Sequence, residues 1–286
     1  MTDSPQKMKI DTGRSSAGWS SYGCFRKCPR KFAYENRNSI EGKRGGARGL
    51  GSLVHGLLAD HYVKIGQKRD GIVDEHPETA EETARELAQD FGVDDEDRDL
   101  ALTRYREYCA HYRDDPWSPV TVEVEHKIGF LVRGDRIEVV EHGTEGSVPY
   151  TSRIDLVAKD RQGKVWIVDH KTAAKIRWDT KTRYGVSGQM HGFHWIGRFF
   201  YGEAFAGVML NLIQTRAGVE FKRVRPVAAP KMVENFPRLV IHTAGEIAKL
   251  DAWAQNIEDW PTSANETVCV STYGLCDHAD RCRFGG

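Results

Sequence analysis

The sequence predicts a mixed α/β or α+β fold in which helices flank a central mixed β-sheet. Helical patterns predominate between residues 20 and 118, and alternating β-rich runs follow as far as residue 172. An aromatic helix, two more strands and a long helix come after them. This order, with helices before and after a run of strands, is typical of one sheet with helices packed on its faces.

The composition is that of a globular protein that can bury a core. The chain has 286 residues, of which 40% are apolar, and its 41 Lys and Arg residues balance 41 Asp and Glu residues. Any nucleic-acid surface therefore has to be a local patch. No apolar run approaches the roughly 20 residues of a membrane span, and the N-terminus lacks the apolar region of a signal peptide. We expect a cytoplasmic protein with no membrane partner. In such a protein, the six cysteines indicate metal binding or redox chemistry more than disulfide bonds.

Four regions follow from these patterns. Residues 1–18 are polar and are expected to form a flexible tail. Residues 19–118 form an N-terminal helical region with a helical insertion, and residues 119–228 hold the core sheet. Residues 229–286 hold a C-terminal helix and a Cys-rich tail.

The N-terminal region begins with two basic segments. Residues 20–36 show a helical pattern around a Cys-Pro step, with Arg and Lys between aromatic side chains. Residues 40–51 are rich in Gly and basic residues but lack the Gly-Lys-Ser/Thr ending of a phosphate-binding P-loop. The first is either a solvated helix or a surface that faces phosphate, and the second is either a linker or a loop that contacts a phosphate backbone.

A strongly amphipathic helix is predicted at residues 51–64, with His55 close to its apolar face. A single His on a helix is usually structural. Gly51 lies one turn before His55 and would let another part of the molecule approach closely. Two further helices, at residues 78–91 and 97–112, form the helical insertion.

Strands at residues 119–130 and 137–140 begin the sheet, because apolar and polar residues alternate there. Glu123 and Glu125 leave the same side of the first strand. We interpret them as a solvent-facing pair and keep Glu125 as a reserve candidate for the acidic cluster on the next strands.

The central strands, at residues 153–158 and 165–168, contain the strongest functional signal. Each carries a carboxylate where a buried strand favours an apolar residue: Asp155 in the first and Asp169 at the end of the second. Lys171 follows Asp169 by two residues, so both side chains leave the same face. Two carboxylates and an ammonium on adjoining strands are costly unless a cation or an anionic substrate lies among them. Such hard oxygen ligands suit Mg²⁺ or Mn²⁺.

The last part of the fold alternates helix and strand. An aromatic helix is predicted at residues 188–201, with Gln189 as a polar exception near its start. Two strands follow at residues 205–214 and 219–227, and a long helix is predicted at residues 231–257, between two prolines. The strands add to the central sheet, and the helices are available to cover it.

The tail holds three cysteines, Cys269, Cys276 and Cys282, in a segment with little secondary-structure signal. Such a segment cannot form its own core and needs a crosslink or a bound metal to fold. Cys28 is the natural fourth ligand, because packing does not explain a Cys-Pro step in a helix. Four cysteines suit zinc or an iron–sulfur cluster, and the lack of close Cys-x-x-Cys pairs favours iron–sulfur. The alternatives are zinc held with the help of His278, and plain reduced thiols. Cys24 is an alternate ligand, and Cys109 is expected to be a buried small hydrophobe.

Four of these motifs, in this order, resemble the PD-(D/E)xK nucleases of the RecB-like branch: GSLVH, RIDLV, VDHKT and a Gln at the head of an aromatic helix. Asp155 matches the first acidic position, and Asp169 with Lys171 matches the (D/E)xK motif. His55 matches the His of a GxxxH motif, and Gln189 the Gln of a QxxxY motif. The Cys-Pro step and the Cys triplet resemble the iron–sulfur version, which includes CRISPR-associated exonucleases, AddB-type nuclease domains and phage exonucleases.

The resemblance covers the chain from about residue 20 onward and implies a restriction-endonuclease-like fold that hydrolyses DNA phosphodiester bonds with Mn²⁺ or Mg²⁺. The implied metal ligands are Asp155, Asp169, His55 and the backbone carbonyl of His170. Lys171 would orient or help deprotonate the attacking water. Gln189 would position substrate or water, or simply cap its helix. A structural 4Fe-4S cluster would be held by Cys28, Cys269, Cys276 and Cys282.

The resemblance also implies a substrate, which is single-stranded DNA or DNA ends in recombination, repair, or CRISPR or phage DNA processing. The resemblance leaves open whether the protein forms a homo-oligomer or binds a partner protein from these processes. Phe193 occupies the Tyr position of QxxxY, so that hydroxyl is missing or supplied elsewhere. The competing functions are a DNA-binding or adaptor protein on a decayed nuclease fold, a hydrolase of small phosphoesters, and a zinc-stapled interaction module.

Overall fold

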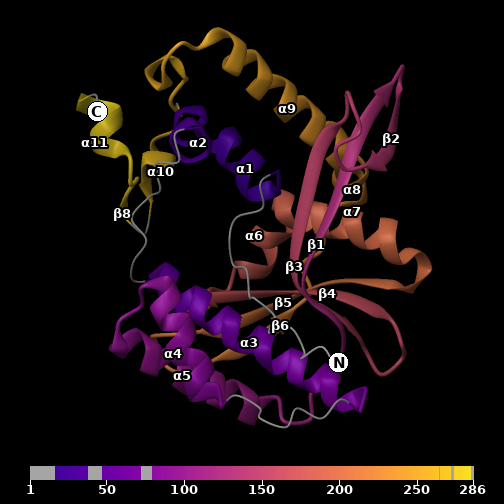
Figure 1. The fold of residues 1–286 in the computed structure, drawn as a ribbon, viewed down its shortest axis with the longest axis vertical. Helices are drawn as coiled ribbons and strands as arrows, with labels where there is room; N and C mark the ends of the chain where they lie inside the picture. The colour runs from indigo at the N-terminus through magenta and orange to yellow at the C-terminus, as the bar shows by residue number, and fades with distance from the viewer. Residues whose placement is uncertain (1–16, 38–46, 72–78, 264, 272–273, 285–286) are drawn as a thin grey trace, which may run out of the picture.

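A computed structural model describes residues 17–37, 47–71, 79–263, 265–271 and 274–284, and its centre is a six-stranded sheet (Figure 1). The strand order is β2-β1-β3-β4-β5-β6. β4 and β5 are parallel, whereas the other neighbouring pairs are antiparallel. The strands are β1 Ser118–Arg133, β2 Arg136–Glu141, β3 Val148–Lys159, β4 Val165–Ala173, β5 Phe205–Gln214 and β6 Phe221–Val224.

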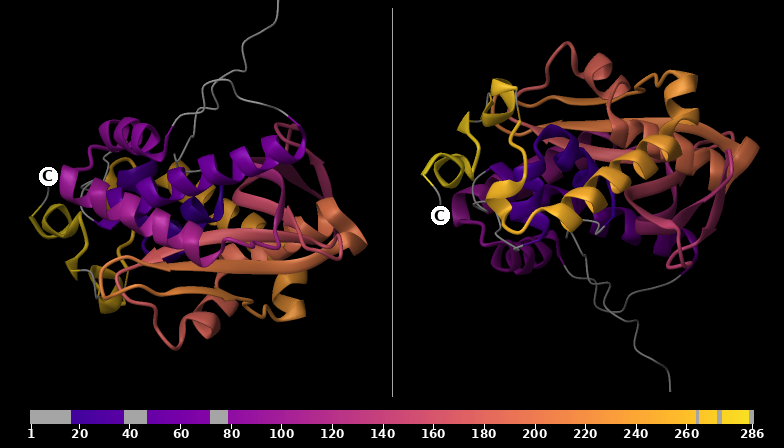
Figure 2. Two further views of the ribbon diagram at one scale, coloured as in Figure 1. Left: turned by 90° about the horizontal axis from the view of Figure 1, so that it is seen from below. Right: turned by 90° about the horizontal axis from the view of Figure 1, so that it is seen from above.

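Helices cover both faces of this mixed sheet, which confirms the predicted fold class. Figure 2 (left) shows α3, α4 and α5 on one side of the β4–β5 part of the sheet and α6 on the other. The main helices are α1 Trp19–Lys27, α2 Pro29–Asn36, α3 Ala47–Arg69, α4 Ala80–Phe91, α5 Asp95–His111, α6 Thr180–Gly185, α7 Gly188–Tyr201, α8 Pro230–Glu234 and α9 Phe236–Trp253. None of the helices in the described ranges is long and apolar enough to cross a membrane.

β3 pairs with two neighbours over different lengths. It pairs with β1 from Val148 to Lys159, but with β4 only from Leu156 to Lys159. The last pair is Leu156 with Val168, so the two strands separate at the next residues, Asp155 and Asp169. In Figure 1, β1 to β3 accordingly run steeply while β4 to β6 lie across them. We call this point of separation the β3–β4 fork.

Alternation along the strands divides the apolar side chains between two faces. Val157 and Ile167 belong to the largest core, which also holds residues of α1, α7 and α9. Leu156 and Val168 point the other way and pack with Tyr62 of α3. A third cluster joins α3 to α4 and α5. Because both faces are covered, any charged side chain on the inner strands lies in a buried setting.

The N-terminal helical pattern is broken at Cys28. This residue has an extended backbone (φ −157°, ψ 104°) between α1 and α2, and its Sγ accepts the backbone N–H of Lys31 at 3.5 Å. Pro29 is suited to the first position of α2, where no backbone N–H is needed. The Cys-Pro step therefore separates two helices instead of kinking one.

The long helix predicted at residues 231–257 is wrong. The structure has α8 and α9 with Asn235 between them, and α9 ends at Trp253. Pro237 lies in the first turn of α9 and has no N–H to bond with a preceding turn, so a helix cannot run through this point without losing a hydrogen bond. The helix predicted at 188–201 and the strand at 205–214 have the observed bounds.

The C-terminal tail folds into short elements beside α2: α10 Glu266–Cys269, β7 Val270–Ser271, β8 Gly274–Leu275 and α11 Ala279–Phe284. Arg30 of α2 holds the segment just before the tail. Its side-chain Nε donates to Trp260 O at 2.9 Å, and its backbone N–H donates to Pro261 O at 3.0 Å. Nearly all of the predicted N-terminal tail, and most of the Gly-rich segment 40–51, lie outside the described residues.

Candidate active site

The β3–β4 fork places Asp155 and Asp169 next to each other. Since the strands no longer pair at this point, the backbone N–H of His170 is available to Asp155 and donates to its Oδ2 at 2.7 Å. Lys171 Nζ donates to Asp169 Oδ1 at 2.9 Å and lies 2.8 Å from Oδ2. Two acids and an amine, which the sequence places on two strands, thus meet where the sheet opens.

His55 reaches the same point from α3. Its Nδ1 lies 3.6 Å from Asp155 Oδ2. One turn earlier, a Cβ added at Gly51 would lie 2.8 Å from Thr172 Oγ1 on β4. Glycine therefore allows α3 to approach β4 closely enough for His55 to face the carboxylates.

Burial dominates the electrostatics of the two acids. Burial raises the pKa of Asp169 to about 6, against the opposing effect of Lys171 and with a further rise from Asp155. The pKa of Asp155 is also raised by burial, although Lys171 and the His170 N–H counteract this. Two carboxylates this close resist being ionised together.

The two basic groups respond in opposite directions. Burial by itself lowers the pKa of Lys171, but the carboxylates of Asp169 and Asp155 outweigh it and hold the pKa above its ordinary value. Burial, helped by the charge of Lys171, lowers the pKa of His55 to about 4. At neutral pH the site therefore contains a charged amine and a neutral imidazole that can donate a lone pair to a metal.

The chemistry of this donor set fits a divalent cation. Asp169, whose side chain is only 2% exposed, and Asp155 supply oxygen donors, and His55 supplies a nitrogen. Within the described ranges, however, no three His, Cys, Asp or Glu groups converge as a ready-made metal site. Asp169 is engaged by Lys171 instead, so a cation that binds here has to compete with that ammonium.

Gln189, the fifth residue that the sequence singles out, lies in the first turn of α7, next to the buried Met190. Within the described residues, no hydrogen bond links it to the fork. The structure therefore brings Asp155, Asp169, Lys171 and His55 together, whereas the role of Gln189 stays a prediction.

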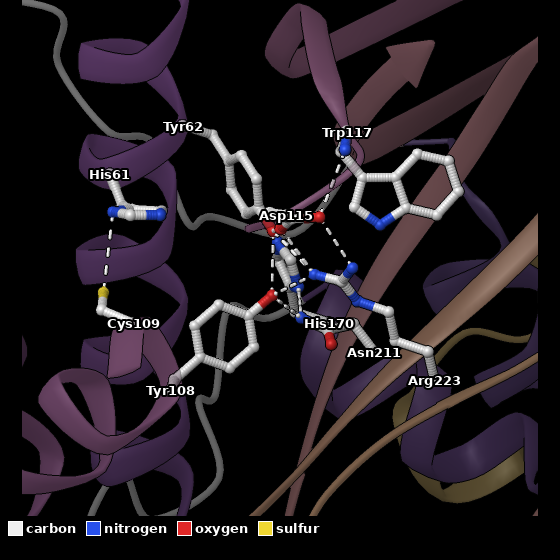
Figure 3. Close-up of polar contacts among 9 residues, drawn as sticks. All are labelled: His61, Tyr62, Tyr108, Cys109, Asp115, Trp117, His170, Asn211 and Arg223. Atoms are coloured by element: carbon white, nitrogen blue, oxygen red, sulfur yellow. Dashed lines mark hydrogen bonds and ion pairs between the residues drawn. The ribbon is translucent and has the colours of Figure 1, made fainter. Parts of the chain in front are cut away.

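A second group of polar residues surrounds the side chain of His170, which leaves the opposite face of β4 from Asp169 and Lys171 (Figure 3). The strand register aligns His170 with Asn211 on β5, and Asn211 with Arg223 on β6. We call these three residues the polar row. Asn211 Nδ2 lies 2.8 Å from His170 Nδ1, and the His170 ring stacks on Tyr62 of α3 at 5.8 Å. The side chain of His170 is thus fixed on both sides.

Helical residues complete the network around Arg223. Its guanidinium donates to both oxygens of Asp115, at 2.8 and 2.7 Å, and to the hydroxyl of Tyr108 at 2.9 Å. Tyr62 OH donates to Asp115 Oδ2 at 2.8 Å. Arg223 is 13% and Asp115 8% exposed, so this is a buried ion pair. Both terminal nitrogens of Arg223 are hydrogen-bonded, whereas its Nε is buried and has no partner among the described residues.

The network also determines which nitrogen of His170 carries the proton. Asp115 only accepts, so Tyr62 donates to it, and Tyr108 OH, 2.8 Å away, donates to Tyr62. The oxygen of Tyr108 is then left to accept from Asn211 Nδ2 at 2.8 Å. With the amide in this orientation, the other N–H of Asn211 faces His170 Nδ1, so that nitrogen accepts and the ring proton is on Nε2.

Sequence reasoning missed this network. The sequence singles out His170 for its backbone carbonyl, whereas in the structure its ring meets Asn211 and lies 6.0 Å from the ring of His55. The participants come from α3, α5, the chain after α5, and three strands, so no local motif joins them. The one local signal is an Asn inside the apolar β5, where a buried amide requires partners.

The four cysteines proposed as ligands lie near one another at the tail. Burial raises the pKa of the Cys282 thiol; Arg30 opposes this rise, and Cys28, Cys276 and Cys269 add to it. Cys28 is buried, Cys269 is exposed, and all are free thiols. Among the described residues, no three of these thiols are close enough together to hold a metal ion. Segments about 240 residues apart in sequence nevertheless put their thiols within electrostatic reach.

The two reserve candidates, Glu125 and Cys24, and the remaining cysteine, Cys109, make other contacts. Glu125 pairs with Lys127 on its own strand at 3.3 Å. Cys24 Sγ lies 3.7 Å from Glu35 Oε2, beside the buried His278, which stacks on Tyr34. Cys109 is half-buried and not a fully buried hydrophobe as expected, because its sulfur sits 3.6 Å from His61 Nδ1 at the α3–α5 contact.

Residues 18–283 match the family model described as the PD-(D/E)XK nuclease superfamily. No curated protein matches the chain by sequence. Among solved structures, a "Putative exonuclease" from Eubacterium rectale aligns at 12% identity over 98% of this chain and 94% of that chain, with a TM-score of 0.48. SSO0001 aligns at 10% identity over 76% of this chain and 84% of that chain, with a TM-score of 0.32. Both likenesses are too distant to say anything about function.

Proposed function

Because the chain belongs to the PD-(D/E)XK nuclease superfamily, we propose that it hydrolyses DNA phosphodiester bonds as an exonuclease that depends on Mn²⁺ or Mg²⁺. The observation that carries the proposal is the meeting of Asp155, Asp169, Lys171 and His55 at the β3–β4 fork. The RecB-like order of motifs supports the choice of DNA and of ends. Recombination, repair, or CRISPR or phage DNA processing would be its setting.

The donor atoms of the site divide into two groups by role. Asp155, Asp169, His55 and the His170 carbonyl would hold the metal, which when bound polarises a phosphate oxygen and lowers the pKa of its water. Lys171, held by Asp169 at 2.9 Å, orients the attacking water and offsets the charge that builds on the phosphate. Gln189 would position the substrate. The neutral ring of His55 keeps its lone pair available at neutral pH.

Lys171→Ala tests this assignment. With Mn²⁺ and end-labelled single- and double-stranded DNA, we expect cleavage to fall at least ~10²-fold while DNA binding persists. Lys159→Ala is the matched control, because that lysine is exposed at the far end of β3. A fully active Lys171→Ala protein would rule out the mechanism. A wild-type protein that binds DNA without cutting it would instead favour an adaptor on a decayed nuclease fold.

We also propose that Cys28, Cys269, Cys276 and Cys282 hold a 4Fe-4S cluster that ties α2 to the tail. Support comes from the proximity of the four thiols and from the break that presents Cys28 between two helices. Protein purified without oxygen should be brown and contain iron. Colourless protein with stoichiometric zinc would favour a zinc site instead, with His278 as a further ligand. Cys28→Ala should reduce stability more than cleavage, because metal binding is coupled to folding.

A further inference from the structure

One segment near the fork has a rigid base and an exposed tip. Residues 174–187, which we call the α6 segment, connect β4 to α7. Ile176 is held by its N–H, which donates to Gln214 Oε1 at 2.9 Å, and its side chain packs on the main core with Tyr184. At the other end, Gly185 lies so close to Val227 O that an added Cβ would be 2.8 Å from it. The segment is therefore fixed at both ends.

Trp178 projects from the tip. It is 93% exposed, the highest value among the large hydrophobic side chains that the structure describes as exposed. The turn beneath it is ordered: Thr180 donates to Arg177 O from its N–H at 3.2 Å and from Oγ1 at 2.7 Å. A tryptophan is rarely left in water, because its large apolar surface favours burial. A rigid turn that presents one indicates a surface for stacking.

The residues around Trp178 are mostly cationic. Four exposed basic side chains belong to the α6 segment: Lys175, Arg177, Lys181 and Arg183. The only acid in the segment is Asp179, which accepts from Arg177 Nε at 3.0 Å. In a chain with no net charge, this is a local positive patch. An aromatic face surrounded by cations fits a ligand with flat rings and many phosphates.

The α6 segment lies beside the proposed catalytic lysine. It follows β4 directly, three residues after Lys171. Lys171 and Asp169 leave the same face of β4 as Ile167, whose core cluster includes Ile176 and Tyr184. Tyr184 is also close enough to Lys171 to help raise its pKa. A polymer bound along the α6 segment therefore passes next to the fork.

We propose that the α6 segment binds single-stranded DNA, with Trp178 stacked on an unpaired base and the four cations on the phosphates. This rests on the proposed nuclease function and adds the site that selects the form of the substrate. Bases inside a duplex are already stacked on each other, so Trp178 can stack on bases along an unpaired strand but not on those inside a duplex. The wild type should therefore prefer single strands, and the preference should depend on Trp178.

The test is DNA binding in EDTA, which prevents metal-dependent cleavage. Fluorescence anisotropy compares labelled oligothymidylate of about 12 nucleotides with an abasic oligomer of the same length and charge. We expect Trp178→Ala to weaken oligothymidylate binding about 5- to 150-fold, as loss of one stacked base predicts. It should leave abasic and blunt duplex DNA nearly unchanged, and Trp178→Phe should recover most of the loss. Trp253→Ala, at a 66% exposed tryptophan on α9, is the matched control.

The outcomes separate this inference from the nuclease proposal. If the wild type binds oligothymidylate no better than the abasic oligomer, or if Trp178→Ala binds it like the wild type, the stacking site is overturned and the nuclease proposal stands. If the wild type binds no DNA of any form, both fail. With single-stranded DNA, Lys181→Ala should also make the plot of log binding constant against log salt concentration less steep by about 0.7. An unchanged slope would remove Lys181 from the site.

Discussion

Replacing Arg223 with Met tests how firmly the polar row is held. Arg223 donates to both oxygens of Asp115, and both side chains are nearly buried. Met keeps the apolar stem but removes the charge. Among the contacts described for Asp115, only the Tyr62 hydroxyl and the Trp117 backbone N–H then remain as hydrogen-bond donors. A buried carboxylate that loses its ion-pair partner costs ~3–5 kcal/mol.

The predicted loss is measurable by thermal unfolding. With ~2.1 cal/mol/K per residue, the 286-residue chain has an unfolding entropy of ~0.6 kcal/mol/K, so Arg223→Met should lower the Tm by ~5–8 °C. The double variant Asp115→Leu/Arg223→Met should recover much of this, because no charge is then left unpaired. A Tm within 1 °C of the wild type for Arg223→Met, or a double variant that loses more than the single variant, would refute the reasoning.

Three other predictions concern the fork and the helix that approaches it. Mn²⁺ affinity, measured by calorimetry, should fall about tenfold for each pH unit below about pH 6. The reason is that the pKa of Asp169 is raised, so below that pH the metal has to displace a proton from its carboxyl group. A Mn²⁺ affinity that does not change between pH 5 and 7 would contradict this. Gly51→Val should weaken Mn²⁺ binding and cost ~1–3 kcal/mol, because its Cβ meets Thr172. Gly66→Ala in the same helix has only one neighbour, 4.0 Å away, and should raise stability by ~0.5–1 kcal/mol without changing the metal affinity.

The central part of the fold was predictable because its signals are local. Asp155, Asp169 and Lys171 stand out as charged residues in strands that are otherwise apolar, and period-two alternation assigns their faces. The approach of α3 was partly visible in the sequence, since a glycine one turn before His55 permits a close contact. What could not be foreseen is that the contacting group is Thr172.

Features that depend on distant partners could not be predicted. Asp115 and Arg223 are 108 residues apart, and in the sequence one is an ordinary acid after a helix and the other an ordinary base within a strand. The exposure of Trp178 is equally invisible, because the pattern around it fits a buried aromatic as well as an exposed one. The split between α8 and α9 could have been predicted, because Pro237 fits the first turn of a new helix and not the interior of a longer one.

The short pairing between β3 and β4 makes the turn between them a sensitive part of the chain. Only four residue pairs, Leu156 with Val168 through Lys159 with Val165, keep the two carboxylates on a common face. Sliding one strand by a single residue would send Asp169 to the side now occupied by His170 and bring the imidazole into its place. The length of the turn, residues 160–164, therefore helps to determine which side chains meet at the fork. An insertion of one residue that slid the strands in this way would also move Ile167 off the largest core, so it should abolish activity and lower stability.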